Sequence, residues 1–429
     1  MSDAWQESTS WFPQSFEALR EAGAEISIVS FNEAYRPPWV QEHYPILSRW
    51  ISLPLSQMDP SFAENRAIRI ASNLSRNPIR KISRLMERIV NRIVQGYHRS
   101  KIRKEYFPEA PPFADRRYDH FESIYRGIIA SQADIIWVLK GHYLDIATLA
   151  AKKVDAQIVY EHVDLCYTGS DANECLAKWM PYEVALAKKT ASTIVCAPGY
   201  VTYYQSYASD APIPRIYARY LTPNFMAASL IQPQKPLRYL HFGRSHPSRL
   251  PGLLIRAFEK TDADALLTFQ GPNNMCSDTQ LDRDIFEKAA AGNYPKVQVL
   301  ESCSVDQIFD TVRSHDVGIV LHDTLAEGRI HCLTTKICTY FAAGLMVLSV
   351  DTPGIRAGVK DSEAVIFLRD SSVKSIAEAL DCIDSMSDEE VMRRKNAALE
   401  MAQLWDWESH GKAEYIAEFV HAANQSFRR

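Results

Sequence analysis

The chain has 429 residues, of which 46% are hydrophobic and 23% charged, and its formal net charge is −4. This length is enough for two domains of ordinary size, and the composition is that of a soluble globular protein. No run of about 18 apolar residues is present and residues 1–10 are polar, which excludes a membrane-spanning helix and predicts no signal peptide. The eight cysteines form no CxxC pair and no zinc-type spacing, which fits small buried side chains in a reducing cytoplasm.

The beginning of the chain predicts an α/β domain whose first strand is missing. Residues 15–22 are typical of the end of a helix, and apolar residues indicate strands over 25–31 and 46–53. Residues 1–12 contain no apolar run that could form a preceding strand. Either translation starts further upstream or the sheet lacks a central strand. We favour the first, because a gap in the sheet would leave backbone groups unpaired.

Residues 76–104, from Arg76 to Lys104, concentrate positive charge in a chain that is otherwise acidic. The segment has ten Lys or Arg and one acid, Glu87. An apolar stripe at helical spacing is formed by Ile82, Leu85, Met86, Ile89, Ile93 and Tyr97. One interpretation is a basic amphipathic helix that contacts an anionic membrane or acceptor, and the other is a core-packing helix with a solvated basic face. Aromatic side chains for stacking on bases are few, which argues against nucleic acid as a partner.

Two predicted strands in the first half of the chain are followed by polar side chains. A strand is expected over residues 134–139, followed by His142, and a second one ends at residue 160, followed by a loop with His162 and Asp164. Open α/β sheets bind ligands at the C-terminal ends of their strands. We therefore expect His142, Glu161, His162 and Asp164 to be placed for chemistry. The alternative is an ordinary structural role for each histidine.

The remaining elements alternate between helices and strands, as expected for doubly wound domains. In the first half, helices are expected over residues 115–131, 144–153 and 171–189 and a strand over 192–197. After a linker over 231–235, strands are expected over 237–242, 266–270, 297–300, 316–321, 345–350 and 364–368, and helices over 305–314, 373–385, 388–403 and 405–427. No P-loop and no G-x-G-x-x-G motif is present, which weakens kinase and dehydrogenase interpretations.

Residues 334–354 read as a short helix, a glycine stop, a buried strand and a turn over 351–354. This stretch resembles the K-x-x-E-Y-M-A-x-G-x-P-V-I segment of GT-B glycosyltransferases, which use nucleotide-sugars. The matching residues are Lys336, Tyr340, Ala342, Gly344 and Val347. Thr339 stands where the family usually has a Glu that binds the ribose of the donor, and Met346 replaces the usual proline.

A second segment that resembles this family follows the predicted strand over 237–242. Gly243, Arg244 and Arg249 precede a predicted helix and match V-G-R-x(4)-K-G, with Arg249 in place of the lysine. In physical terms, two cations at a helix N-terminus make a phosphate site; the alternative is a pair of surface arginines. The resemblance implies further donor-binding positions at Lys336, Thr335, Thr339, Cys303 and Glu327.

The resemblance implies an α/β fold with two Rossmann-like doubly wound domains that face a cleft. The acceptor-side domain is expected over residues 1–230, the nucleotide-sugar domain over 231–404, and a helix over 405–429 that crosses back to the first domain. The implied activity is transfer of a sugar from a nucleotide-sugar to a saccharide, lipid-linked or other acceptor. His162, Asp164 or His142 would face the acceptor hydroxyl. No cofactor or metal is expected, since the protein supplies its own cations.

A different class of function is also compatible with the sequence. A GT-B-shaped binding or scaffold protein without catalysis would explain Thr339 and the irregular N-terminus. In either case we expect a cytoplasmic protein, which would be peripheral at the inner membrane face if residues 76–104 contact lipid.

Overall fold

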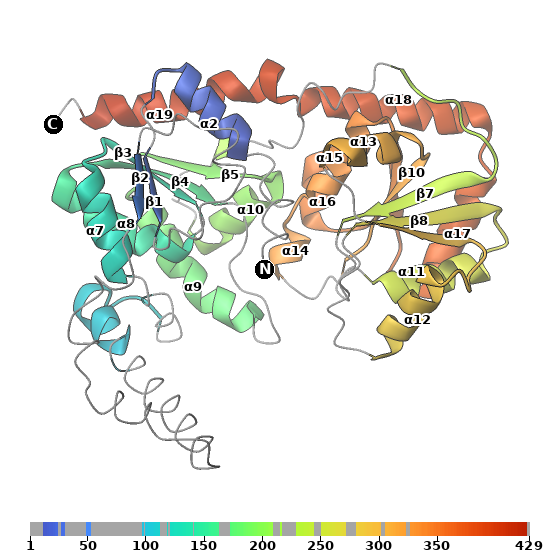
Figure 1. Ribbon diagram of the computed structural model, residues 1–429, viewed down its shortest axis with the longest axis horizontal. Helices are drawn as coiled ribbons and strands as arrows, with labels where there is room; N and C mark the ends of the chain where they lie inside the picture. The colour runs from blue at the N-terminus through green and yellow to red at the C-terminus, as the bar shows by residue number, and fades with distance from the viewer. Residues whose placement is uncertain are drawn as a thin grey trace, which may run out of the picture. The chain divides into compact units, whose positions relative to one another are not determined.

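The computed structural model of the chain describes residues 12–24, 27–30, 49–52, 97, 99–111, 118, 121–139, 141–162, 172–208, 215–216, 229–243, 250–271, 280–301, 305–322 and 327–426 (Figure 1). It divides into two compact units. The N-terminal unit is formed by Pro13–Ile194, Tyr204–Arg215 and Ile416–Arg429. The C-terminal unit is formed mainly by Val195–Tyr203 and Ile216–Tyr415. Each unit contains parallel β-structure with helices packed against it, so the predicted α/β class is confirmed.

Two separate sheets make up the β-structure of the N-terminal unit. Strands β1 (Ser27–Ser30) and β2 (Arg49–Ser52) pair in parallel. The other sheet has the order β3-β4-β5-β6, with bounds Ile135–Leu139, Gln157–His162, Ser192–Val195 and Arg215–Ile216. In the part of the chain that the structure describes, no strand joins β1 to β3. The strands predicted over 25–31 and 46–53 are confirmed as β1 and β2. The missing first strand stays a prediction, because residues 1–11 lie outside the described residues.

Helices cover both faces of the four-stranded sheet (Figure 1). The helices of this unit are α2 (Phe12–Glu21), α7 (Phe121–Ser131), η4 (Gly141–Tyr143), α8 (Leu144–Val154) and α9 (Ala172–Ala187). The last turn of α10 (Pro198–Tyr207), from Tyr204, and most of α19 (Lys412–Ser426), from Ile416, also belong to this unit. The apolar face of α8 is buried, and Leu144, Ala147 and Ala151 recur along it at helical spacing. On the opposite face, Glu418 of α19 accepts a hydrogen bond from Ser192 Oγ at 2.6 Å, and Phe419 packs edge-on against Trp137 at 5.8 Å. The C-terminal end of the chain is therefore part of this unit.

One sheet of six parallel strands forms the centre of the C-terminal unit. Its order is β12-β11-β10-β7-β8-β9. The strands are β7 (Leu237–Phe242), β8 (Ala265–Gln270), β9 (Val297–Leu300), β10 (Val317–Val320), β11 (Met346–Val350) and β12 (Val365–Leu368). All five residues of β11 are buried, as predicted for an apolar strand covered on both faces. The order reverses between β7 and β10, which is the point where doubly wound sheets bind ligands.

The helices of this unit lie in two layers. One layer contains α11 (Pro251–Lys260), α12 (Gln280–Ala290) and α17 (Val373–Asp384), and the other contains α13 (Val305–Arg313), α15 (Thr335–Ala342) and α18 (Asp388–Leu404) (Figure 1). The short helices α14 (Glu327–Ile330) and α16 (Pro353–Val359) and the π-helical turn η7 (Trp407–Gly411) complete the unit. None of the helices in the described residues is long and apolar enough to cross a bilayer.

A buried ion pair fixes α18 to the sheet. Lys395, which is 1% exposed, donates to Asp316 Oδ1 at 3.1 Å and to the carbonyl oxygen of Ile231 at 2.9 Å. The same carboxylate accepts from the backbone N–H of Arg238 at 3.1 Å. One lysine thus joins the helix, the sheet and the beginning of the predicted linker, and its partners compensate the cost of burying both charges.

Two sequence predictions are wrong at their boundaries. Residue 161 and His162, predicted in a loop, belong to β4 and are buried. The segment 351–354, predicted as a turn, contains the start of α16, because Thr352 accepts a hydrogen bond from the Ile355 N–H and Pro353 occupies the first helical position.

Candidate functional site

The hydroxyl of Tyr340 lies where β7 and β10 separate. The two strands pair only from Val317 to Gly318 on the β10 side. Beyond this point the Tyr340 hydroxyl donates to the carbonyl oxygen of Leu240 at 2.9 Å and accepts from the backbone N–H of Phe242 at 3.3 Å. A Cβ on Gly318 would collide with the Tyr340 ring, so only glycine leaves room for it. The tyrosine thus bonds the end of β7 at the point where the sheet opens.

The side chain of Lys336 lies against the backbone of Gly243, the residue that follows β7. Lys336 is in the first turn of α15 and is 8% exposed. Gly243 follows β7 directly with a φ of +91°, and a Cβ there would lie 3.0 Å from Lys336 Cε and 3.4 Å from Nζ. Glycine is therefore required at residue 243 for two reasons: its φ is positive, and the lysine side chain leaves little room for a Cβ. The result is a cation held against a backbone that carries no side chain.

A second close approach of backbones shapes the same edge of the sheet. Gly243 donates its N–H to the carbonyl oxygen of Gln270 at 2.7 Å. Gly271 follows Gln270, and any side chain on Gly271 would collide with the backbone of Gly243. The amide of Gln270 in turn donates to the carbonyl oxygen of Glu301, which ties the ends of β8 and β9 together. The ends of β7, β8 and β9 are thus held in a fixed arrangement beside Lys336.

The N-terminus of α15 faces the site with unshielded backbone. Its N-cap residue, Thr334, has extended dihedral angles and makes no side-chain capping hydrogen bond. No acidic residue is present in the first turn, so nothing on this helix neutralises the positive end of its dipole. Anions bind at such helix ends, and Lys336 adds a full positive charge to the partial one.

The structure describes five of the eight predicted donor positions. Gly243, Thr335 and Lys336 lie together at the end of β7 and the start of α15, where Thr335 is exposed. Thr339 is one turn further along, half-buried, and its hydroxyl donates to the carbonyl oxygen of Thr335 at 3.2 Å. Glu327 begins α14. Arg244, Arg249 and Cys303 are outside the described residues.

In the N-terminal unit, His162 belongs to a buried polar cluster around the carboxylate of Glu183. Nδ1 of His162 lies 2.8 Å from Oε1 of Glu183, which also accepts from the hydroxyls of Tyr160 at 2.7 Å and Tyr204 at 2.6 Å. Trp179 donates to the other carboxylate oxygen. All five side chains are at most 1% exposed. The cluster joins β4, α9 and α10 within the core.

Glu183 is ionised within this core. Burial by itself raises the pKa of Glu183, but the adjacent His162 and the hydrogen bonds donated by the histidine and the tyrosines outweigh burial and lower the pKa to about 2. Because a carboxylate can only accept, the proton between the two residues lies on Nδ1 of His162. The structure thus places His162 in the core of the unit, and its predicted acceptor-side role stays a prediction. His142 lies in η4, and Asp164 is outside the described residues.

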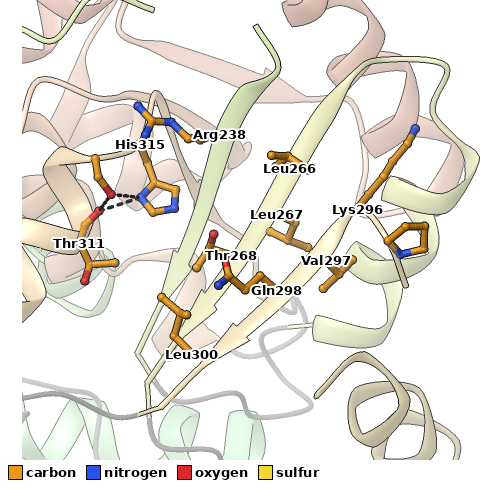
Figure 2. Close-up of a pocket in the computed structure, with 12 residues that line it drawn as sticks. Arg238, Leu266, Leu267, Thr268, Lys296, Val297, Gln298, Leu300, Thr311 and His315 are labelled. Carbon is orange, nitrogen blue, oxygen red and sulfur yellow. Dashed lines mark hydrogen bonds between the residues drawn. The ribbon is translucent and has the colours of Figure 1, made fainter. Parts of the chain in front are cut away.

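A pocket in the C-terminal unit lies away from the end of β7. A pocket of about 440 Å³ runs along β8 and β9 and is closed on one side by Thr311, Ser314 and His315 at the end of α13 (Figure 2). Nδ1 of His315 is 2.7 Å from the carbonyl oxygen of Thr311, and burial lowers the pKa of this histidine. None of the predicted donor residues lines the pocket. The predicted donor chemistry therefore lies at the end of β7 and not in this pocket.

The sequence did not predict a role for two residues, His241 and Glu183, that make notable polar contacts in the structure. His241, the penultimate residue of β7, is 1% exposed and has Nε2 3.4 Å from Nζ of Lys336. Glu183 centres the cluster in the other unit. In both cases the sequence places a titratable side chain inside an otherwise apolar strand or helix, and this pattern could have indicated a buried polar contact. Among the described residues, no group of three or more His, Cys, Asp or Glu is placed to hold a metal ion.

Comparisons with known proteins extend these observations. No family model matches the chain, and no curated protein matches its sequence. Solved structures do match: a glycosyltransferase from Rickettsia africae is 12% identical, covering 98% of this chain and 96% of that chain, with a TM-score of 0.62. HepE from Anabaena in complex with UDP is 13% identical, covering 71% and 82%, with a TM-score of 0.54. Sucrose-phosphate synthase from Thermosynechococcus elongatus is 15% identical, covering 73% and 80%, with a TM-score of 0.55.

These neighbours are GT-B glycosyltransferases. At such low sequence identity the likeness establishes the fold and not the substrates. The parallel sheets, the reversal of strand order between β7 and β10, and the likeness to these structures together show that this chain has the GT-B fold.

Proposed function

We propose that this protein is a glycosyltransferase that takes its sugar from a nucleotide-sugar, with the diphosphate bound at the end of β7. The observation that carries the proposal is the position of Lys336, whose ammonium lies over the bare backbone at Gly243. The N-terminus of α15 lies at the same place and is free of acidic residues. A cation, a helix N-terminus and an uncovered backbone are the features that bind phosphate groups.

The same arrangement suits the chemistry of sugar transfer. When the bond between sugar and diphosphate breaks, negative charge develops on the leaving nucleoside diphosphate. Lys336 and the dipole of α15 would stabilise this charge most strongly as it develops, and fixed charges of this kind lower the barrier. Arg244 and Arg249, which the sequence predicts for the same loop, would add two further cations. The proposal requires no metal and no cofactor, because these groups are the protein's own.

We expect a saccharide or lipid-linked acceptor, since the family resemblance permits both. His162 is buried with its Nδ1 proton directed at Glu183, so a role as a base requires an acceptor that reaches its other nitrogen. His142 and Asp164, at the ends of the same pair of strands, are the alternative residues for the acceptor hydroxyl.

A donor screen tests the proposal. Purified protein is incubated with UDP-, GDP- and ADP-sugars, and release of the nucleoside diphosphate is measured with and without added saccharides. We expect release from the sugars of one nucleotide, and loss of that release in a Lys336→Met variant. If no donor is hydrolysed and none binds, the proposed function is wrong.

A catalytically inactive binding protein is the second candidate, and Thr339 favours it. The family's Glu at this position binds the ribose of the donor, whereas the Thr339 hydroxyl is bonded to the backbone of its own helix. Nucleotide-sugar binding without release or transfer, across all donors and acceptors tried, would support this candidate. Transfer by the wild-type protein would exclude it.

A further inference from the structure

An imidazole lies inside the strand that leads into the proposed diphosphate site. His241 is on β7 between Leu240 and Phe242 and is 1% exposed. Its ring packs against Phe269 of β8, with ring centroids 5.4 Å apart. A polar ring buried between apolar neighbours is costly unless its nitrogens are bonded. An aliphatic residue would fill this buried position of the strand without a polar group, so the presence of a histidine needs a specific explanation.

One contact of this imidazole is with the cation of the proposed site. Nε2 of His241 lies 3.4 Å from Nζ of Lys336, at the long end of hydrogen-bonding distance. An ammonium is a donor only, so in this contact Nε2 must act as the acceptor. The imidazole is then neutral, with its proton on Nδ1. On its other side the lysine stem packs against Gly243.

We propose that His241 is a positioning residue for Lys336, holding the ammonium toward the loop after β7 so that a diphosphate finds it already in place. The proposal rests on the proposed function only for the identity of the ligand, since the contact exists without one. A lysine side chain loses considerable rotamer freedom when it binds an anion. A fixed acceptor and a glycine that leaves room for the stem reduce that loss, because the side chain is ordered before the ligand arrives.

The chemistry of the acceptor explains why a histidine occupies this position. A carboxylate at the same place would also hold the ammonium, but it would cancel the positive charge that the diphosphate requires. A neutral imidazole orients Lys336 and leaves its charge intact. The ammonium of Lys336 thus has a fixed direction and keeps its full charge. An aliphatic residue at position 241 would not fix the direction, and an acid would not preserve the charge.

The contact can be tested without any ligand. Nitrogen NMR of protein labelled in its histidines reports the tautomer of each ring. We expect the signals of His241 at neutral pH to show a protonated Nδ1 and an unprotonated Nε2 that accepts a hydrogen bond, and the Nε2 signal to move in Lys336→Met. A protonated Nε2 in the wild-type protein, or no change in the variant, would overturn the proposal.

A double-mutant cycle tests the consequence for binding, with UDP, GDP and ADP as probes. His241→Phe keeps an aromatic ring and removes the acceptor, and we expect it to weaken binding of the preferred nucleotide about fivefold to tenfold. In a Lys336→Met background the same change should have no further effect, because His241 acts through the lysine. His241→Gln, whose amide oxygen can accept, should recover most of the affinity.

A matched control separates positioning from folding. His315 is also a buried histidine of the C-terminal unit, 6% exposed, but it lies in the pocket along β8 and β9. His315→Gln should leave nucleotide affinity unchanged even if it lowers the melting temperature. Equal weakening by His241→Phe in the wild-type and Lys336→Met backgrounds would show a merely structural role. If the wild-type protein binds none of the three nucleotides, the proposed function fails, while the NMR experiment still decides the positioning of Lys336.

Discussion

Nδ1 of His162 lies 2.8 Å from Oε1 of Glu183, and the two side chains are 0% and 1% exposed. They come from β4 and α9, and two tyrosine hydroxyls donate to the same carboxylate oxygen. A carboxylate in the core is stable only when donors surround it, because its desolvation is expensive. This relationship makes Glu183 the residue on which the packing of α9 against β4 depends.

Glu183→Gln is expected to destabilise the N-terminal unit. The pKa of Glu183 is about 2 in the folded protein against an ordinary value of 4.5, so the ionised form contributes on the order of 3 kcal/mol. Because the folded pKa is the lower one, this contribution is complete above about pH 4.5 and is lost as the pH falls toward 2. Denaturant unfolding followed at pH 7 and pH 3 should show a large difference between wild type and variant at pH 7 and a smaller one at pH 3.

Glu174→Gln on the same helix is the control for this experiment. Glu174 is 70% exposed and pairs with Lys178 on the surface of α9. Exposed pairs of this kind contribute roughly 0–1 kcal/mol. The control should therefore unfold like the wild type at both pH values. Equal loss of stability in the two variants would show that burial of Glu183 is not the cause.

Tyr340→Phe is expected to weaken the C-terminal unit, whereas Tyr239→Phe is not. The hydroxyl of Tyr340 bonds the Leu240 carbonyl and the Phe242 N–H, and removing it leaves both groups buried without this partner, at a cost of about 1–3 kcal/mol. Tyr239 is also buried, but within the described part of the chain its hydroxyl has no hydrogen-bond partner. Its ring contact with Phe258 survives the change to Phe. Thermal unfolding of the two variants distinguishes them, and a larger loss in Tyr239→Phe would contradict this assignment.

The strands of the C-terminal unit could be predicted from the sequence because their signal is simple. Strands β7 and β9 have the predicted bounds, and the other four differ by one or two residues. Parallel strands that are covered on both faces are continuous apolar runs in the sequence. The end of each strand is therefore predicted at the first polar residue after the run. The strand signal does not bring Lys336 to Gly243: only the resemblance to GT-B glycosyltransferases implies both as donor positions, and the structure shows that they are in contact.

The same signal fails where a polar residue is buried. The sequence predicts that strand β4 ends at residue 160, because Glu161 and His162 follow, yet both residues lie in the strand. Their partners come from distant elements: Trp137 donates to Glu161 at 3.0 Å, and Glu183 bonds His162. No local pattern shows that a partner 20 or more residues away will satisfy a polar side chain, so tertiary contacts decide such boundaries. The same limit applies to His241, whose contact with Lys336 joins residues far apart in the sequence.

Lys336→Met is expected to weaken nucleotide binding at least tenfold. A hydrogen bond from an ammonium to a phosphate is worth about 1.5–3 kcal/mol, and the variant loses both the bond and the charge. Met fills a similar volume, so packing against Gly243 should persist. Calorimetry with the preferred nucleotide measures the effect, and Lys374→Met serves as the control because Lys374 is 80% exposed on α17. An unchanged affinity in Lys336→Met would remove the lysine from the site.

The basic segment 76–104 leads to the last prediction, which is weak, salt-sensitive binding to anionic membranes. Most of this segment is outside the described residues, but its end is helical and amphipathic: Ile102 is 7% exposed, Lys101 and Lys104 are exposed, and Tyr97 of the apolar stripe is 74% exposed. The exposed tyrosine is unexpected for a helix that buries its stripe in the core. It favours the interpretation in which part of the stripe faces outward.

Vesicle co-sedimentation tests this interpretation. Each Lys or Arg at an anionic surface contributes about 1 kcal/mol, and the attraction falls off within a Debye length. We therefore expect binding to vesicles that contain phosphatidylglycerol, little binding to neutral phosphatidylcholine vesicles, and release at high salt. Arg84→Glu with Arg88→Glu should abolish binding, while Arg369→Glu with Lys374→Glu, at exposed positions of the C-terminal unit, should not. Binding that is equal for both kinds of vesicle, or that survives the first pair of changes, would show that the basic face is merely solvated.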